Sequence, residues 1–180
     1  MKTTIINIYG APGAGKSTLA AEIYAELNKR GESVELVREV AKEYAWTGRL
    51  PSTFEQIYIT TEQMLKETAL YGKVKYVVTD SPIELGDFYN QYYHNNLALS
   101  NEWLIEVSKA SYPYMEALIG LFVPIEPKLF QNNGRFSNLE ESLHIEKQLK
   151  KYLDNQWLQY KELNNPETRL QDALKEINAG

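Results

Sequence analysis

Residues 10–17 carry a spacing of glycine, lysine and serine that suits the binding of phosphate groups. They read GAPGAGKS and match the pattern G-x-x-x-x-G-K-[ST]. The glycines let backbone N–H groups curl around phosphate oxygens, and the start of a following helix adds partial positive charge. Lys16 can reach the β- and γ-phosphates of a nucleotide, and the Ser17 hydroxyl can ligate Mg²⁺. The predicted nucleotide-binding residues are Gly10, Ala11, Pro12, Gly13, Ala14, Gly15, Lys16, Ser17 and Thr18.

A carboxylate follows a second apolar stretch. Residues 77–79 read VVT and lead directly into Asp80, as in a strand that delivers a carboxylate to the sheet edge where ligands collect. We predict that Asp80 orients Mg²⁺ or its water and so acts in catalysis. The alternative is that Asp80 caps the helix after Pro82.

Arg38 and Glu39 end another apolar stretch, which places both at the same predicted edge. A carboxylate there can accept the proton of an attacking hydroxyl, so Glu39 is the predicted catalytic base and also contacts the acceptor. Arg38 could hold a substrate phosphate through two parallel hydrogen bonds. The alternative is that both residues lie on the solvated face of a short helix.

Aromatic residues crowd two places, and flat rings there could stack on a nucleobase. The predicted acceptor-binding aromatics are Tyr44, Trp46, Phe88 and Tyr92. Phe88 and Tyr92, like the neighbouring Tyr89 and Tyr93, are also spaced by four residues on a predicted helix. Packing of that helix would explain the same pattern.

The stretch 124–137 has two prolines, an Asn-Asn-Gly sequence and few apolar residues, which is typical of an exposed flap. We predict a lid at about 124–138 whose Arg135 neutralises charge during phosphoryl transfer and helps to exclude water. The alternative for Arg135 is an ordinary exposed loop position.

Short apolar stretches alternate with helical periods, which predicts an α/β fold with a parallel sheet between two layers of helices. The expected strands are Thr3–Tyr9, Ser33–Val37, Lys75–Thr79, Ala117–Val123 and Trp157–Lys161. Helices are expected at Lys16–Arg30, at Ile83–Tyr93, at Glu102–Ala110 and at Pro166–Ile177. Capping boxes at Ser52–Glu55 and Ser137–Glu140 predict two more, running to about Leu70 and Leu153.

The 180 residues suit one domain spanning residues 1–180. With 19 basic and 24 acidic residues, the formal net charge is −5, so a general coat for nucleic acids is disfavoured. Cysteine is absent, which excludes disulfide frameworks and cysteine nucleophiles. No signal peptide or bilayer-spanning run is found, so we expect a cytoplasmic protein that does not bind membranes.

Together, Gly10–Ser17, Arg38-Glu39, the Thr79–Pro82 segment and the Gly-Arg flap resemble the P-loop kinases of nucleosides and nucleotides. The chain is most similar to a small phage-type group related to nicotinamide-riboside kinases and thymidylate kinases, over about Thr3–Leu153. The resemblance implies a three-layer P-loop fold with a five-stranded parallel sheet of order 2-3-1-4-5, a mobile lid, and ATP with Mg²⁺. It also implies that Glu39 occupies the place of the base in nucleoside kinases.

Two departures from the family pattern bear on the acceptor. The third strand often ends Asp-Arg in these kinases, whereas this chain has Asp80-Ser81. Monophosphate kinases usually carry several arginines in the lid, whereas the segment 124–137 has one. The second departure favours a hydroxyl acceptor over a phosphate acceptor.

The leading hypothesis is therefore an ATP-dependent kinase that acts on a nucleoside-like or nucleotide-like acceptor. One alternative within this class is a kinase of 5-hydroxymethyluracil in phage DNA, and another is a nucleoside monophosphate kinase. A P-loop ATPase or GTPase that acts as a switch, and a binding module without turnover, stay open. The sequence also leaves open whether two chains form a homodimer.

Overall fold

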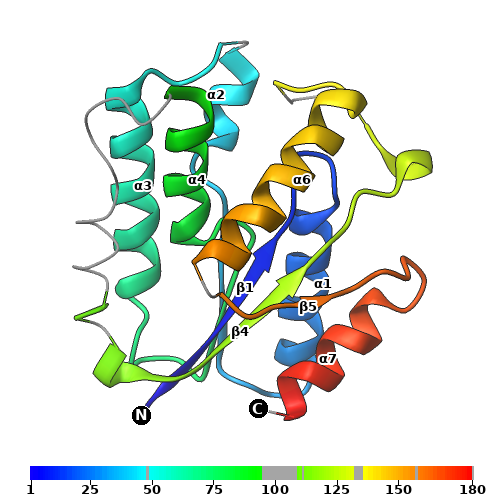
Figure 1. Cartoon of the computed structure of the whole chain (residues 1–180). Coiled ribbons are helices and arrows are strands. Elements are labelled where there is room, and N and C mark those ends of the chain that lie inside the picture. Colours follow the sequence, from blue (N-terminus) through cyan, green and yellow to red (C-terminus); the bar gives the residue numbers. More distant parts are fainter. Residues whose placement is uncertain (48, 95–108, 111, 132–135, 157, 180) are drawn as a thin grey trace.

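A five-stranded parallel sheet forms the centre of the protein (Figure 1). The computed structural model describes the whole chain except residues 48, 95–108, 111, 132–135, 157 and 180. The strand order is β2-β3-β1-β4-β5, and every neighbouring pair is parallel. The strands are β1 (Thr3–Tyr9), β2 (Val34–Val37), β3 (Tyr76–Thr79), β4 (Met115–Phe122) and β5 (Lys161–Glu162). The predicted fold class and strand order are confirmed.

Helices cover both faces of this sheet. They are α1 (Lys16–Lys29), α2 (Lys42–Thr47), α3 (Thr53–Thr68), α4 (Ile83–His94), α6 (Leu139–Asn155) and α7 (Arg169–Ala179). Two 3-10 turns, η1 (Tyr112–Tyr114) and η2 (Pro127–Leu129), flank β4. Figure 1 shows α3, α4 and α6 over one face, and α1 packs with α7 on the other. No helix in the described part of the chain is long and apolar enough to cross a membrane.

The central strand β1 is almost wholly buried, as expected where helices cover both faces of a parallel sheet. Ile6 and Ile8 are fully buried in the main apolar core with α1. The buried Thr3 of β1 is held by two hydrogen bonds: its hydroxyl donates to the Val74 carbonyl at 2.6 Å and accepts from the Gly72 N–H at 2.8 Å. The strand therefore gives a rigid base to the loop that follows Tyr9.

Helix boundaries follow capping chemistry. The Ser52 hydroxyl accepts a hydrogen bond from the Glu55 N–H, and the Glu55 carboxylate accepts one from the Ser52 N–H, so the predicted capping box of α3 is confirmed. Helix α1 ends before Gly31, whose φ of +79° is the left-handed conformation that ends many helices.

The second predicted capping box is wrong by one residue. Asn138 is the N-cap of α6 and accepts from the Glu141 N–H at 2.9 Å. The Ser137 side chain is buried instead, and its hydroxyl lies 2.8 Å from that of Ser142. Asn is as good an N-cap as Ser, so the local pattern could not rank them.

The fifth strand also differs from its prediction. Helix α6 continues to Asn155, and the two-residue strand β5 pairs Lys161 with Leu121 and Glu162 with Phe122. So short an edge strand is set by its partner β4, not by its own residues. The predicted helix at 102–110 lies outside the described residues, apart from its last two positions.

Candidate active site

Some of the predicted functional residues, Glu39 and Asp80 among them, lie where β1, β2 and β3 end. The pairing of Thr79 with both Asn7 and Val37 brings these parallel ends side by side. A cavity of about 310 Å³ opens there, lined by the phosphate loop, by Glu39, and by residues of α2, α3 and α4. This is the position at which open α/β sheets bind ligands.

The loop 10–15 has the backbone needed to cradle phosphate. Gly13 has a φ of +88°, and a Cβ atom there would overlap the Phe130 ring. Gly15 has a φ of +97° and is the N-cap of α1, with no side chain capping the helix. The N–H groups at this helix start therefore have no capping side chain in front of them, which suits an anion.

Most of the predicted nucleotide-binding residues reach the cavity. Those that line it are Pro12, Gly13, Gly15, Lys16, Ser17 and Thr18. Gly10, Ala11 and Ala14 belong to the same loop but are buried and do not line the cavity. The Lys16 ammonium donates to the Ala11 carbonyl at 3.2 Å, so the lysine folds over the loop.

Arg169 at the start of α7 supports this loop and was missed from the sequence. Its guanidinium donates to the carbonyls of Leu163 at 3.2 Å, Pro124 at 2.8 Å and Ala14 at 3.4 Å. Partial burial lowers the pKa of Arg169, although the nearby Glu126 and Glu146 oppose that shift. No local pattern marks an arginine whose partner lies 155 positions away.

Asp80 and Glu39 lie close together. The Asp80 carboxylate is 4% exposed, and its Oδ1 accepts the backbone N–H of Glu39 at 2.9 Å. Glu39 is half-buried and lines the cavity, whereas Arg38 is exposed and does not. The phosphate loop and a carboxylate on the acceptor side thus share one cavity.

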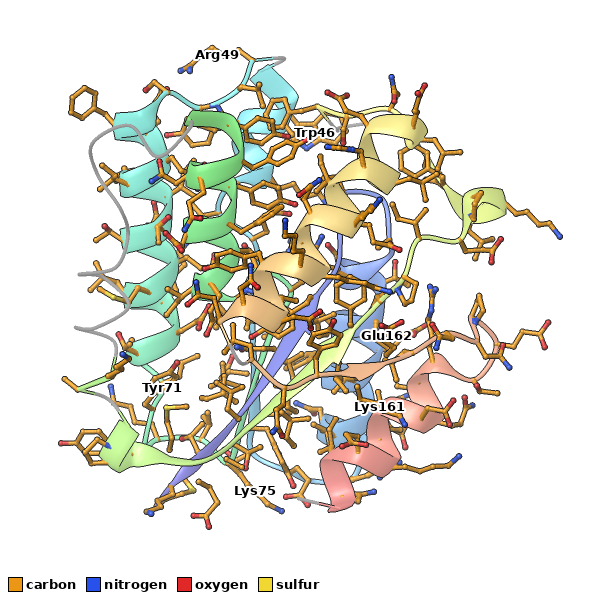
Figure 2. All side chains as sticks on the ribbon, in the orientation of Figure 1. Trp46, Arg49, Tyr71, Lys75, Lys161 and Glu162 are labelled. Atoms are coloured by element: carbon orange, nitrogen blue, oxygen red, sulfur yellow. The ribbon has the colours of Figure 1, made fainter. Side chains whose placement is uncertain are left out.

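Three aromatic residues that line the cavity, Trp46, Tyr89 and Tyr93, come from α2 and α4. Trp46 lines the cavity and is 69% exposed. Figure 2 shows it at the same end of the molecule as Arg49, with Tyr71 and Lys75 at the other. Tyr44 does not line the cavity, and the Arg49 guanidinium lies 5.9 Å from the centre of its ring.

The structure reverses the expected roles on α4. Phe88 is 4% exposed and packs in the core, and Tyr92 stacks on it at 5.7 Å, away from the cavity. Tyr89 and Tyr93 line the cavity instead, with ring centres 5.9 Å apart and planes 14° from parallel. Both pairs have the same spacing, so the sequence could not show which faced the cavity. Burial, and then the negative charge of Glu39, raise the pKa of Tyr89.

Polar residues of α3 form another wall of the cavity, which was not predicted from the sequence. Gln56, Thr60 and Gln63 line the cavity and are buried. Behind them, Glu67 is 2% exposed. Burial raises its pKa from 4.5 to about 8. The hydrogen bond from Gln63 lowers this pKa, and the charge of Glu84 raises it further.

The predicted lid is described only in part. Gln131 and Phe136 line the cavity. Arg135, the predicted lid cation, lies outside the described residues.

Comparison with known proteins agrees with this geometry. A family model described as an AAA domain matches residues 5–172. A probable thymidylate kinase of Sulfurisphaera tokodaii is 27% identical over an alignment of length 165, and the match covers 83% of this chain and 80% of that protein. A solved deoxyadenosine kinase of M. mycoides, with dCMP and a flexible dCDP bound, superposes with a TM-score of 0.59 at 14% identity, over 97% of this chain and 98% of that one.

The family match spans most of the chain, and the predicted family and enzyme class are confirmed. The chain belongs to the AAA-domain family and is a phosphotransferase of the P-loop nucleotide kinase type.

Proposed function

We propose that the protein transfers the γ-phosphoryl group of ATP to a hydroxyl of a nucleoside-like acceptor. The observation that carries this proposal is one cavity lined by Lys16 and Ser17 of the phosphate-binding motif and also by Glu39. Donor and acceptor could therefore meet without a change of fold. The kinase relatives support the same class of reaction.

In this reaction the acceptor oxygen forms a bond to the γ-phosphorus, and the bond from that phosphorus to the β–γ bridging oxygen breaks, which releases ADP. The acceptor proton passes to the Glu39 carboxylate. The Lys16 ammonium and the N–H groups of the loop stabilise the charge on the phosphoryl oxygens.

The donor set fits a magnesium ion that accompanies ATP. The Ser17 hydroxyl and the Asp80 carboxylate are oxygen donors of the kind that Mg²⁺ prefers, and we propose that they hold it directly or through water. Bound Mg²⁺ would neutralise charge on the β- and γ-phosphates. Arg135 stays our proposed lid cation.

The cavity walls support a planar acceptor. Trp46, Tyr89 and Tyr93 offer aromatic faces, and Gln56 offers an amide that can pair with a base. Phe88 and Tyr92 shape this wall from behind, and Arg38 and Tyr44 are now proposed to act only at the rim. A cytoplasmic location also stays a proposal.

A second candidate is a nucleoside monophosphate kinase. Lys42 lines the same cavity and could hold a phosphate on the acceptor. The thymidylate kinase relative supports this reading. A phosphate acceptor would need no base, so Glu39 separates the two candidates.

Purified protein, Mg²⁺ and γ-labelled ATP tested against a panel of acceptors would examine both. The panel holds thymidine, deoxyadenosine, nicotinamide riboside, their monophosphates, and a DNA duplex containing 5-hydroxymethyluracil. We expect label in a nucleoside monophosphate. Label in a diphosphate would favour the second candidate, and label in the duplex the phage-type alternative. Label found only as free phosphate with every acceptor would overturn the proposal and favour a switch NTPase. Running the protein on a calibrated sizing column would test whether two chains form a homodimer.

A further inference from the structure

Gln63 connects the cavity to the backbone that carries Glu39. The side chain extends from α3, is 3% exposed and lines the cavity. Its Oε1 atom accepts the backbone N–H of Val40 at 3.2 Å. Its Nε2 atom donates to Glu67 Oε1 at 3.2 Å and to Thr79 Oγ1 at 3.3 Å. One amide thus bridges the loop after β2, the strand β3 and a buried carboxyl group.

Two consecutive N–H groups of this loop are therefore held from two different elements. Asp80, at the end of β3, accepts from Glu39, and Gln63, on α3, accepts from Val40. These N–H groups belong to the two peptide planes on either side of the Glu39 Cα atom. Holding both planes fixes the direction in which the Glu39 side chain leaves the backbone. A displacement of about 1 Å of a catalytic group can cost about 100-fold in rate.

The position requires an amide rather than any polar side chain. The Val40 N–H needs an acceptor, whereas the Glu67 Oε1 atom, which also accepts from the Thr79 hydroxyl at 3.3 Å, needs a donor. Glutamine offers one of each. A glutamate at 63 would place two carboxyl groups together, and an apolar residue would leave a buried N–H without an acceptor.

We propose that Gln63 is a positioning residue that holds Glu39 for proton transfer through the Val40 N–H, with Glu67 fixing which end of the Gln63 amide faces the loop. This inference rests on the proposed function, because it takes Glu39 as the base. It assigns roles to Gln63 and Glu67 of α3, which the proposed function uses neither for phosphate binding nor for acceptor binding.

The test is a reciprocal exchange between positions 63 and 67, measured with the panel nucleoside that the wild-type protein phosphorylates fastest. Gln63→Glu should lower kcat about 10- to 100-fold, with little change in the KM for ATP. The double variant Gln63→Glu, Glu67→Gln restores one acceptor facing Val40 and one amide facing position 63. It should recover at least about 10-fold of the lost kcat, since coupled residues depart strongly from additivity.

Gln91→Met is the matched control. Gln91 donates to the Asp87 carboxylate at 2.7 Å and lies outside the cavity, so its loss should leave kcat within about 2-fold. Thermal unfolding of every variant shows whether the fold is kept. If Gln63→Glu does not fold, the kcat of the double variant is compared with that of the wild-type protein. A folded double variant with less than a tenth of the wild-type kcat contradicts the inference.

Failure of the inference and failure of the proposed function can be told apart. If the wild-type protein transfers phosphate to a nucleoside but Gln63→Glu keeps its kcat, the positioning role is wrong and the kinase assignment stands. A folded double variant no faster than Gln63→Glu also overturns the positioning role. If the wild-type protein transfers phosphate to no nucleoside, the proposed function fails, and the inference fails with it.

Discussion

The Asp80 carboxylate accepts the backbone N–H of Glu39 at 2.9 Å, across 41 positions of sequence. Asp80, which we propose as a ligand of Mg²⁺, thus also holds the loop that carries Glu39, the proposed base. In the proposed mechanism, this one side chain would link the metal site to the loop that carries the base. The two roles can be separated by choosing the substitution.

Asp80→Asn keeps an oxygen that can accept from Glu39 but removes the charge. We expect kcat to fall about 100-fold and the Mg²⁺ concentration needed for half-maximal rate to rise, as for loss of one electrostatic stabiliser. Asp80→Ala should show the same loss and also lose about 1–2 kcal/mol of stability, because the Glu39 N–H is left without its acceptor.

Steady-state kinetics over a magnesium series and thermal melts would measure both effects. Asp154→Asn, at an exposed position, serves as the control. Wild-type kinetics in Asp80→Asn would show that the carboxylate holds the loop and does not serve the metal.

Lys16→Met removes the ammonium that lies on the phosphate loop. We expect kcat to fall by about 100- to 1,000-fold, with the fold kept, because one charge aimed at the phosphoryl oxygens is lost. Lys147→Met, on the exposed surface of α6, should change nothing measurable. A Lys16→Met protein that retained more than a tenth of the wild-type kcat would argue against phosphate binding by residues 10–17.

Glu39→Gln separates a hydroxyl acceptor from a phosphate acceptor. With a nucleoside, kcat should fall at least about 100-fold while ATP binding measured by calorimetry is unchanged, since the lost group acts on the acceptor proton. Glu35→Gln is the control, because Glu35 is an exposed residue of β2. Unchanged turnover in Glu39→Gln would remove the base from the mechanism and point to the monophosphate kinase.

Glu67 makes stability depend on pH. Its pKa is raised from 4.5 to about 8 by burial, so between these values the unfolded chain releases a proton that the folded protein keeps. The free energy of unfolding should therefore fall as pH rises through this window. Glu67→Gln carries no such proton and should lose less stability between pH 5.5 and 8.5, by more than about 1 kcal/mol.

Chemical denaturation at several pH values would measure this difference. Glu35→Gln should follow the wild-type curve. Parallel curves for wild type and Glu67→Gln would show that Glu67 is ionised in the folded protein at neutral pH.

Arg169 ties the phosphate loop to the last helix. Arg169→Met removes the donors to three backbone carbonyls and should lower stability by about 1–3 kcal/mol. It should also weaken ATP binding, since the Ala14 carbonyl is one of its partners. Arg30→Met breaks only an exposed ion pair with Glu26 and should cost less than about 1 kcal/mol. Equal melting temperatures for the two variants would contradict this role.

Local pattern was enough to predict strands β1 to β4 and the phosphate loop. The apolar strand Thr3–Tyr9, the glycine motif and helix α1 follow one another in sequence, so short-range chemistry fixes their geometry. The edge positions of Glu39 and Asp80 follow equally from strands that end in carboxylates. Features of this kind need no knowledge of distant contacts.

The remaining parts of the site depend on contacts that sequence spacing does not encode. Tyr89 and Tyr93 face the cavity instead of Phe88 and Tyr92 because tertiary packing sets the rotation of α4. Arg169 and Gln63 form hydrogen bonds with residues far along the chain. Strand β5 exists through its pairing with β4. The positions of these groups are set only in the folded structure.

The central claim is that a phosphoryl group held on residues 10–17 is passed to a hydroxyl beside Glu39. The most direct measurement is a single turnover with excess protein, Mg²⁺, ATP, and a panel nucleoside whose acceptor hydroxyl carries ¹⁸O, followed by mass spectrometry. We predict a nucleoside monophosphate that retains the ¹⁸O in its ester bond, formed by wild-type protein and not by Lys16→Met. ADP and unlabelled phosphate as the sole products, with every nucleoside unchanged, would contradict the claim.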